Sequence, residues 1–575
     1  MAGEGDLEHG IAEEKSSSEP SPSPPRKPEA ENASTKSRWQ LAAVMTPLLV
    51  STFMAAIEYT IISAALPYLV DQLGAGSDYV WFVNSYLLCK TAFIPLWGQL
   101  SAVTGRRWPM MGAVVLFVLG SGIAGGATSS AMMISGRAVQ GLGGGGMTIL
   151  GQLIISDLVP PREVPKYVGY LLAPWLWGLQ LDRLSVVLSY SILLGNGMLA
   201  HGKPKIFWIN FPIGGATLIM QYFLLQVEYS AKQTFMQKVK RIDYAGNALI
   251  VAFTALTLIS LSWAGAEYAW DSAQVLCLLI IGVFGLVGAM CYEAWSPWVK
   301  EPTIHTVIFR NYSTDINLFL AFMQFMFAVW VTYFLPVYFQ AVLLKTAEIA
   351  GLLLLPIVLL PLPLAIIVGR LITRFGRYKL FHVAGFALMA IGYGLFTIFD
   401  DTTSIAVVVV SQCVWSFGLG QLMTSTLPGV QASVDEKLRS PATSTWGFFR
   451  EFGGVWGTAV PAAIFNSQFG RLVGQRISDA SLRDMLSHGN GFSFASANLI
   501  KQLEEENRRQ VIGIFTDSLR LVAQVGIGLS GACFVLSILQ KEYELRKTHH
   551  SEHGLKSKNK ESVPAKTQDE SARLR

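Results

Sequence analysis

Long apolar runs separated by short polar stretches dominate this chain from Trp39 to about Leu539. We count about fourteen runs of roughly 20 residues, the length that an α-helix needs to cross the hydrocarbon core of a bilayer. They cover approximately residues 40–64, 80–101, 109–127, 131–155, 167–190, 206–227, 245–264, 273–292, 315–338, 347–371, 380–398, 404–428, 441–465 and 519–539. The pattern predicts an all-α membrane protein with about fourteen transmembrane helices.

The composition agrees with this interpretation. Only 14% of the residues are charged, whereas soluble domains carry about 25%. The formal net charge of +5 does not indicate a nucleic-acid partner, because the basic residues lie in short loops and in the C-terminal tail. All five cysteines lie in apolar segments without metal-ligand spacing. We therefore interpret them as small buried hydrophobic residues and expect no metal site.

The loops and tails indicate how the chain is oriented. Basic residues concentrate in the loops after even-numbered runs, whereas Asp71, Asp400 and Asp401 lie in loops on the other side. Because cytoplasmic loops carry an excess of Lys and Arg, both termini are predicted to be cytoplasmic. Residues 1–38, rich in Ser, Pro and Glu, and the basic residues 541–575 are expected to be disordered tails, and the second could contact anionic lipid.

A short basic motif occurs twice between apolar runs. GQLSAVTGRR, residues 98–107, returns as GRLITRFGRYK, residues 369–379. A repeated turn of this kind is typical of a membrane protein built from two related halves. The motif residues that we expect to act in gating are Gly98, Gly105, Arg106, Arg107, Gly369, Gly376 and Arg377.

The fourth apolar run carries an arginine, in SGRAVQGLGGGGM, residues 135–147. An arginine in the middle of a membrane helix costs about 3 kcal/mol on insertion scales, so Arg137 must face a polar cavity or a partner. Gln140 lies one turn further along, and Gly141 and Gly143 belong to a smooth face for close helix contact. We expect the glycines to serve packing and Arg137 to have a functional role.

Several of these motifs resemble one family. RAVQGLGGG is similar to the fourth-helix motif RxxQGxGxG of the major facilitator superfamily, in its fourteen-helix drug:proton antiporter branch. GQLSAVTGRR resembles the loop motif of that superfamily, and AAIEYTIISAALP, residues 55–67, resembles the first-helix motif of the branch. KIFWINFPIGG and RIDYAG resemble the starts of its sixth and seventh helices. The tails and the long last external loop resemble fungal members of the toxin and multidrug efflux type.

The resemblance implies two pseudo-symmetric six-helix bundles with two extra central helices. The expected organisation is a tail at 1–38, a first bundle at 39–230, the two additional helices at 231–300, a second bundle at 301–540 and a basic tail at 541–575. A long external loop, mixed in charge and helical in part, is expected at 466–518 within the second bundle.

Glu58 occupies the acidic position of the first-helix motif. An acid buried in a helix can exchange a proton near neutral pH. Glu58 is therefore the first candidate for proton coupling, with Arg137 modulating the affinity for the proton. The alternative is a structural carboxylate whose partner is Thr60 or Lys90.

Further polar and aromatic residues inside apolar runs are candidates for a substrate cavity. Lys90 could pair with Glu58 or hold an anionic substrate, whereas such polar groups more often serve helix packing and such aromatic rings more often face lipid or other helices. The candidates are Asn84, Lys90, Gln412, Trp415, Phe449 and Arg450.

The first loop motif departs from the family pattern. Ala102 stands where the family carries an aspartate that latches the cytoplasmic side, and Val103 follows where an arginine is usual. We expect a weaker latch, so that the gate depends on Arg106, Arg107 and the glycine contacts.

The fifth apolar run lacks the family's antiporter motif GxxxGPxxGG and reads APWLWGLQLDRLSVVLSYS at 173–191, with Asp182 and Arg183 inside it. The segment can be encoded so that another reading frame spells GTAAGPVVGG. We hypothesise that approximately residues 172–202 are a frame-shifted stretch. If the stretch is genuine, a transport-impaired paralogue is the alternative.

These features together predict a proton-coupled exporter of small, mostly apolar organic compounds such as drugs, toxins or fungal secondary metabolites. The alternative is uptake or vacuolar exchange of cationic amino acids or iron chelates. We expect no enzyme activity because no HExxH motif occurs, and no cofactor beyond the proton gradient because no GxxxxGK[ST] loop occurs. No nucleic-acid partner is expected, because the basic residues lie in short loops and in the C-terminal tail. A monomer in the plasma membrane is expected, with the vacuolar membrane as the alternative.

Overall fold

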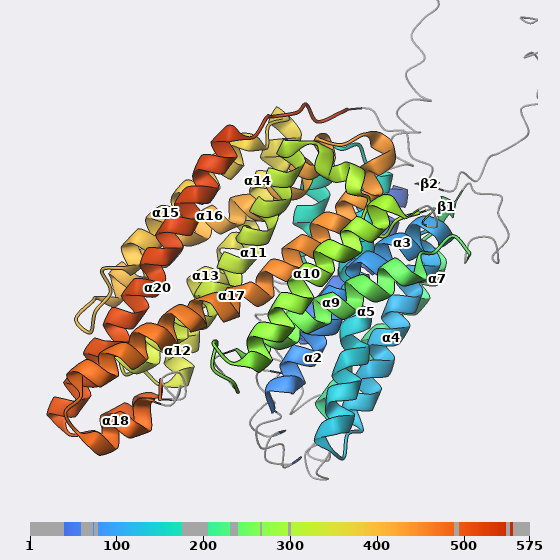
Figure 1. The fold of residues 1–575 in the computed structure, drawn as a ribbon. Helices are drawn as coiled ribbons and strands as arrows, with labels where there is room; N and C mark the ends of the chain where they lie inside the picture. Colours follow the sequence, from blue (N-terminus) through green and yellow to red (C-terminus); the bar gives the residue numbers. More distant parts are fainter. Residues whose placement is uncertain are drawn as a thin grey trace, which may run out of the picture. The chain divides into compact units, whose positions relative to one another are not determined.

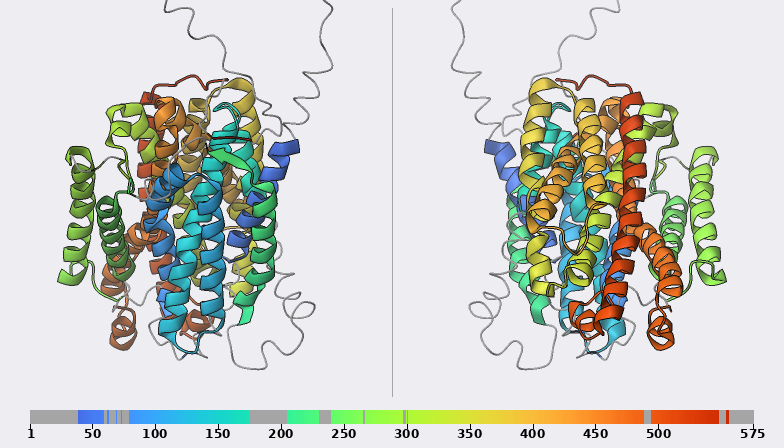
Figure 2. Two further views of the ribbon diagram at one scale, coloured as in Figure 1. Left: turned by 90° about the vertical axis from the view of Figure 1, so that its right-hand side faces the viewer. Right: turned by 90° about the vertical axis from the view of Figure 1, so that its left-hand side faces the viewer.

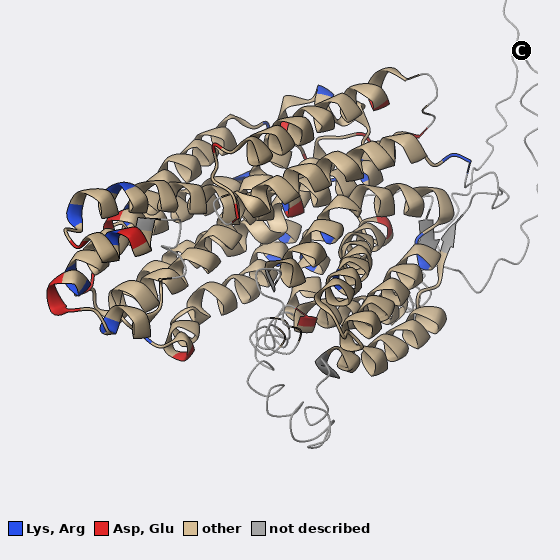
Figure 3. Cartoon of the chain, turned by 60° about the horizontal axis from the view of Figure 1, so that its bottom comes forward, with Lys and Arg blue, Asp and Glu red and all other residues tan. Residues whose placement is uncertain are grey.

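The computed structural model describes residues 39–58, 62, 69, 73, 79–174, 205–229, 240–264, 267–296, 299, 301–487, 494–547 and 553–555. The described residues from Ala43 onward form one compact unit, to which all contacts given below belong. Ten helices within the described ranges are long and apolar enough to cross a membrane. Long stretches of these helices carry no charged residue (Figure 3). The expected total of fourteen stays a prediction.

The helices before residue 230 pack on one another and form the N-terminal bundle (Figure 1). It comprises the helix Trp39–Glu58, α2 (Tyr79–Ala92), α3 (Ile94–Thr104), α4 (Arg107–Gly125), α5 (Ser130–Leu158), helical residues 164–174, the 3-10 turn η3 (Lys205–Ile209) and α7 (Asn210–Leu224). The predicted run 80–101 is interrupted at Phe93, because Pro95 sits at the start of α3. Most of the frame-shift candidate, from residue 175 on, lies outside the described residues.

The two additional helices are α9 (Tyr244–Trp263) and α10 (Ala273–Trp295). Short polar residues begin both of them: Asp243 accepts a hydrogen bond from the backbone N–H of Gly246, and Ser272 accepts one from that of Val275. α9 packs on α2 and α17, and α10 packs on α9 (Figure 2). Gln99 of α3 bonds the side chain of Asn247, at 2.6 Å, so the first loop motif and the additional helices are directly connected.

The helices after residue 301 form the C-terminal bundle. They are α11 (Tyr312–Val337), α12 (Ala347–Leu353), α13 (Leu355–Leu359), α14 (Pro361–Phe375), α15 (Lys379–Phe396), α16 (Ile405–Ala432), α17 (Arg439–Arg476), α18 (Ala480–Ser487), α19 (Ala497–Lys501) and α20 (Glu505–Leu539), with 3-10 or π turns at Thr306–Arg310, Tyr338–Val342 and Glu436–Leu438. Proline at the first or second position of both α13 and α14 divides the predicted run 347–371 into three helices. An aromatic core that includes Phe327, Trp330 and Tyr393 fills this bundle.

Two predicted boundaries differ from the structure. α17 continues to Arg476 and α20 begins at Glu505, so much of the predicted external loop 466–518 is helical. These extensions carry several charged residues and therefore do not continue the apolar runs. The predicted disordered tail from residue 541 begins with an ordered segment, because the backbone N–H of Tyr543 donates to the hydroxyl of Tyr378, and Leu545 is buried. Further along, β2 (His553–Leu555) pairs antiparallel with β1 (Val227–Tyr229).

In both copies of the loop motif, a glycine with positive φ ends the helix. Gly105 ends α3 with φ 92° and ψ 174°, and Gly376 ends α14 with φ 75° and ψ 13°. Among the described glycines these two have positive φ, which L-residues avoid. We call the end of the helices that carries residues 98–107 and 369–379 the loop-motif end.

The two glycines should respond differently to the same substitution. Asparagine tolerates the left-handed conformation of Gly376, but the conformation of Gly105 belongs almost entirely to glycine and costs other residues about 1–3 kcal/mol. We therefore expect Gly105→Asn to lower the thermal unfolding midpoint of the purified transporter by several degrees, and Gly376→Asn to leave it nearly unchanged. Equal effects of the two substitutions would contradict this interpretation.

Candidate functional site

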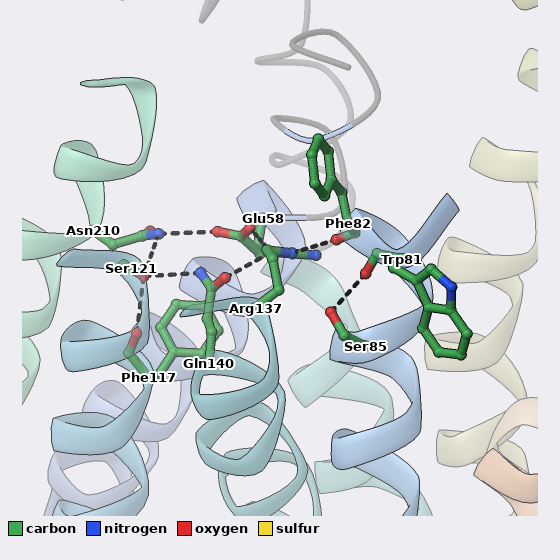
Figure 4. A network of polar contacts seen from close by, with 9 residues as sticks. All are labelled: Glu58, Trp81, Phe82, Ser85, Phe117, Ser121, Arg137, Gln140 and Asn210. Atoms are coloured by element: carbon green, nitrogen blue, oxygen red, sulfur yellow. Dashed lines mark hydrogen bonds and ion pairs between the residues drawn. The ribbon is translucent and has the colours of Figure 1, made fainter. Parts of the chain in front are cut away.

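A buried ion pair lies inside the N-terminal bundle (Figure 4). Arg137, on α5, and Glu58, on the first helix, are 1% and 0% exposed. One guanidinium nitrogen of Arg137 contacts both Glu58 and the side-chain oxygen of Gln140, the latter at 2.6 Å. The Nε of Arg137 donates to the carbonyl oxygen of Phe82 on α2, at 2.8 Å. The structure thus brings together the two residues predicted to act in proton coupling.

The second oxygen of the Glu58 carboxylate is held by a residue that the sequence interpretation missed. Asn210, at the start of α7, donates to it at 3.0 Å and also donates to the hydroxyl of Ser121 on α4, at 3.0 Å. Gln140 donates to the same hydroxyl at 2.8 Å. The motif KIFWINFPIGG contains Asn210, so an asparagine within this apolar stretch could have been recognised as a candidate site residue. Nothing in the sequence around Ser121 marked it as one.

α2 passes directly over this site. The guanidinium carbon of Arg137 lies 4.5 Å from the ring centroid of Tyr86, a cation–π distance. A Cβ on Gly141 would lie 2.3 Å from the carbonyl oxygen of Tyr86, so only glycine lets the two helices approach this closely. On the other face of α5, a Cβ on Gly143 would lie 2.4 Å from the backbone nitrogen of Phe117. The packing role expected for these glycines agrees with the structure.

Lys90 does not pair with Glu58, so that alternative is wrong. Its ammonium lies 2.8 Å from the carboxylate of Glu451 on α17, in the C-terminal bundle. Arg450 contacts the other oxygen of Glu451 at 3.1 Å and covers the ring of Phe325, whose centroid is 4.4 Å from the guanidinium carbon. Glu58 already has Arg137 and Asn210 as partners, which explains why Lys90 is available to another acid. Thr60, the other suggested partner, lies outside the described residues.

The remaining cavity candidates are not brought to one place. Trp415 is buried in the core of the C-terminal bundle, edge-on to Tyr393 with ring centroids 6.1 Å apart. Gln412, on the same helix, is fully buried as well. Phe449 packs against Phe309 with ring centroids 6.2 Å apart, and Asn84 is half-buried on α2. Of the predicted set, Lys90 and Arg450 share a site.

The loop-motif end contains a carboxylate that the sequence interpretation did not assign. Arg106 donates through Nε to Asp157, at the end of α5, at 2.6 Å, and through a terminal nitrogen to the hydroxyl of Ser440 on α17, also at 2.6 Å. The expected gate relied on Arg106, Arg107 and the glycine contacts, and the structure adds Asp157 as an acidic partner of Arg106. The weaker latch expected from Ala102 stays a prediction. Arg107 reaches Tyr222 of α7, within its own bundle, and Arg377 is exposed.

The remaining motif glycines lie at contacts between the two bundles. A Cβ on Gly98 would lie 2.4 Å from the Cβ of Ser444, and a Cβ on Gly369 would lie 2.4 Å from the carbonyl oxygen of Pro165. Arg162 caps the end of α14 by donating to the carbonyl oxygen of Thr373, at 2.9 Å. The two halves of the repeat thus close the same end of the molecule in equivalent ways.

The comparisons with known proteins agree with this architecture. The family description "Major Facilitator Superfamily" matches residues 48–458. The chain belongs to the major facilitator superfamily. It is a multi-pass membrane transporter and not an enzyme. Within the described residues, no group of His, Cys, Asp and Glu side chains could hold a metal ion.

Fungal transporters are similar over nearly the whole chain. The chain is 37% identical to the MFS-type transporter TwmF of Talaromyces wortmannii, with 91% of this chain and 94% of that protein covered. It is 37% identical to the MFS-type efflux pump LUC4 of a Fusarium species, with 92% and 93% covered. It is 38% identical to the MFS efflux transporter aclA of Aspergillus oryzae, with 93% and 96% covered.

Solved structures of transporters share the fold. The human organic anion transporter MFSD10 matches with a TM-score of 0.56 at 13% identity, covering 86% of this chain and 99% of that one. The proton:xylose symporter XylE matches with a TM-score of 0.52 at 15% identity, covering 81% and 96%.

Asp157 should be more important for closing the loop-motif end than the missing acid at position 102. Asp157→Asn removes the charged partner of buried Arg106, so we expect this end to open more often. The measurement is the alkylation rate of Ser444→Cys, opposite Gly98, in a background without native cysteines. We expect a severalfold faster reaction with Asp157→Asn than without it.

Asp517→Asn, in a more exposed ion pair on α20, is the control and should leave the alkylation rate unchanged. Ala102→Asp should change the rate less than Asp157→Asn does. A rate that responds to Ala102→Asp and ignores Asp157→Asn would refute the assigned role of Asp157.

Proposed function

We propose that this transporter is a proton-coupled exporter of small, mostly apolar organic compounds that works by alternating access of the two bundles. The observation that carries the proposal is the Glu58–Arg137 pair. A carboxylate without solvent exposure sits beside a guanidinium, with further hydrogen bonds from Asn210 and, through Arg137, to Gln140. Such a site has two states that differ by one proton, and its contacts change with the charge of Glu58.

Protonation of Glu58 acts on several helices at once. The carboxylate comes from the first helix, while Asn210 lies on α7, Arg137 on α5 and the carbonyl of Phe82 on α2. When Glu58 is neutral, Arg137 loses its charged partner but keeps Gln140 and Phe82. The net charge of the buried cluster then rises by one, which favours a conformation that hydrates or compensates the guanidinium. A proton taken up from one side can in this way drive the rearrangement that exposes the substrate to the other.

Export is the favoured direction because similar fungal proteins carry the names efflux pump and efflux transporter. The chain has no phosphate-binding loop, so the proton gradient is the energy source that we propose, without a cofactor. We propose a monomer surrounded by lipid in the plasma membrane.

Uptake or vacuolar exchange of cationic compounds is supported less well. It would need Glu58 and Glu451 as binding groups, but each carboxylate has a cationic partner within its own bundle, Arg137 and Arg450, which it keeps when the bundles separate. A transport-impaired paralogue depends on the sequence of residues 173–191, most of which lie outside the described residues.

The experiment is resistance of an efflux-deficient host to a panel of toxins at two external pH values. We expect the wild-type chain to raise resistance, more strongly at the lower external pH, and Glu58→Gln to abolish most of the increase because it fixes the site in its neutral form. Glu505→Gln, which changes an exposed carboxylate, is the control and should behave as wild type. Resistance that ignores both Glu58→Gln and pH would overturn proton coupling.

A further inference from the structure

A second buried charge cluster connects the two bundles. Lys90 of α2 and Glu451 of α17 are 7% and 5% exposed, and their charged atoms lie 2.8 Å apart. α2 belongs to the N-terminal bundle and α17 to the C-terminal bundle. Any movement that separates the bundles at this depth therefore has to break the ion pair, whereas the Glu58–Arg137 pair lies within one bundle and need not break.

The cluster is asymmetric. Glu451 has a second cation, Arg450, which is its neighbour on the same helix and contacts its other oxygen at 3.1 Å. Arg450 is held further by the rings of Phe325 and Trp446, 4.4 and 5.7 Å from its guanidinium carbon. These contacts belong to the C-terminal bundle and move with it. After separation of the bundles, Glu451 and Arg450 stay together, and Lys90 loses the partner that it has in this structure.

Lys90 also lies close to the proposed proton site. Phe82, Tyr86 and Lys90 follow one another at helical spacing on one face of α2. Arg137 bonds the carbonyl of Phe82 and covers the ring of Tyr86. The charged groups around Lys90 are thus Glu451 and Arg450 from α17 and, beyond Tyr86, Arg137 and Glu58, which balance each other.

We propose that Lys90 is the charge-selecting residue of the transport cavity: it is paired with Glu451 when the loop-motif end is closed, and it binds a negatively charged group of the substrate when the bundles separate there. Glu451 is then an internal competitor that replaces the anion on Lys90 as the end closes. A buried ammonium without a counter-ion is costly, so an organic anion with an apolar body fits both the charge of Lys90 and the rings of Phe325 and Trp446 beside the cluster. This role of Lys90 specifies the substrate class of the proposed exporter and rests on that proposed function.

Two aromatic compounds that differ in charge test the inference: 1-naphthalenesulfonate, which stays anionic, and 1-naphthalenesulfonamide, which is neutral near pH 7. Binding to the purified full-length transporter is measured by titration. Glu451→Gln removes the internal competitor, so we expect the sulfonate to bind about tenfold more tightly than to wild type, the equivalent of about 1.4 kcal/mol. The double variant Lys90→Gln with Glu451→Gln should lose this gain, and the sulfonamide should bind all three proteins equally.

The test compares Glu451→Gln with the double variant and does not use Lys90→Gln alone. Poor folding of that single variant therefore does not affect the result. Glu505→Gln, in an exposed ion pair with Arg509, is the matched control and should not change binding of the sulfonate. A gain that persists in the double variant, or the absence of any gain in Glu451→Gln, would overturn the role of Lys90. Binding needs no proton gradient, so failure here is distinguishable from failure of proton-coupled export.

Discussion

A guanidinium inside an apolar helix has to be paired, and much of the N-terminal bundle is arranged around that requirement. Leaving one charge of such a buried pair without its partner costs about 3–5 kcal/mol. Arg137 meets the requirement with Glu58, Gln140 and the carbonyl of Phe82. These partners come from its own helix and from two others, and Asn210 of α7 holds Glu58 in turn. The same interaction that stabilises the bundle therefore makes its packing sensitive to a single proton.

Close helix contact is the second part of this arrangement. Gly141 lets the backbone of α2 approach α5 near Arg137, which places Tyr86 over the guanidinium. Gly98 and Gly369 allow an equally close approach between the bundles at the loop-motif end, where Arg106 joins Asp157 and Ser440. Small residues thus let the helices approach until their charged groups are in contact. The ion pairs in turn form only in conformations that keep these helices together. The ion pair between Lys90 and Glu451 likewise depends on contact between helices, here at the interface between the bundles.

The sequence predicted the features that have a strong local signal. Apolar runs, the repeated loop and Arg137 identified a transporter of this superfamily, and the acidic position of the first-helix motif pointed to Glu58. Long-range partners had no such signal. Lys90 and Glu451 are far apart in the sequence, and either could have paired with another charge in the membrane. Asp157 ends a helix as an ordinary polar residue, and its contact with Arg106 depends on how α5 and the loop motif meet. The extensions of α17 and α20 agree with a loop that was expected to be helical in part, but their extent could not be predicted because charged helical turns have no apolar pattern.

The central claim is that Glu58 exchanges a proton during substrate transport. The most direct measurement uses proteoliposomes that contain the purified transporter and a trapped pH-sensitive dye. A substrate gradient is imposed without a pH gradient, and the internal pH is followed. For an antiporter we expect substrate movement to drive proton movement in the opposite direction with wild type, and substrate movement without a pH change with Glu58→Gln. A pH change of equal size in both proteins would contradict the account.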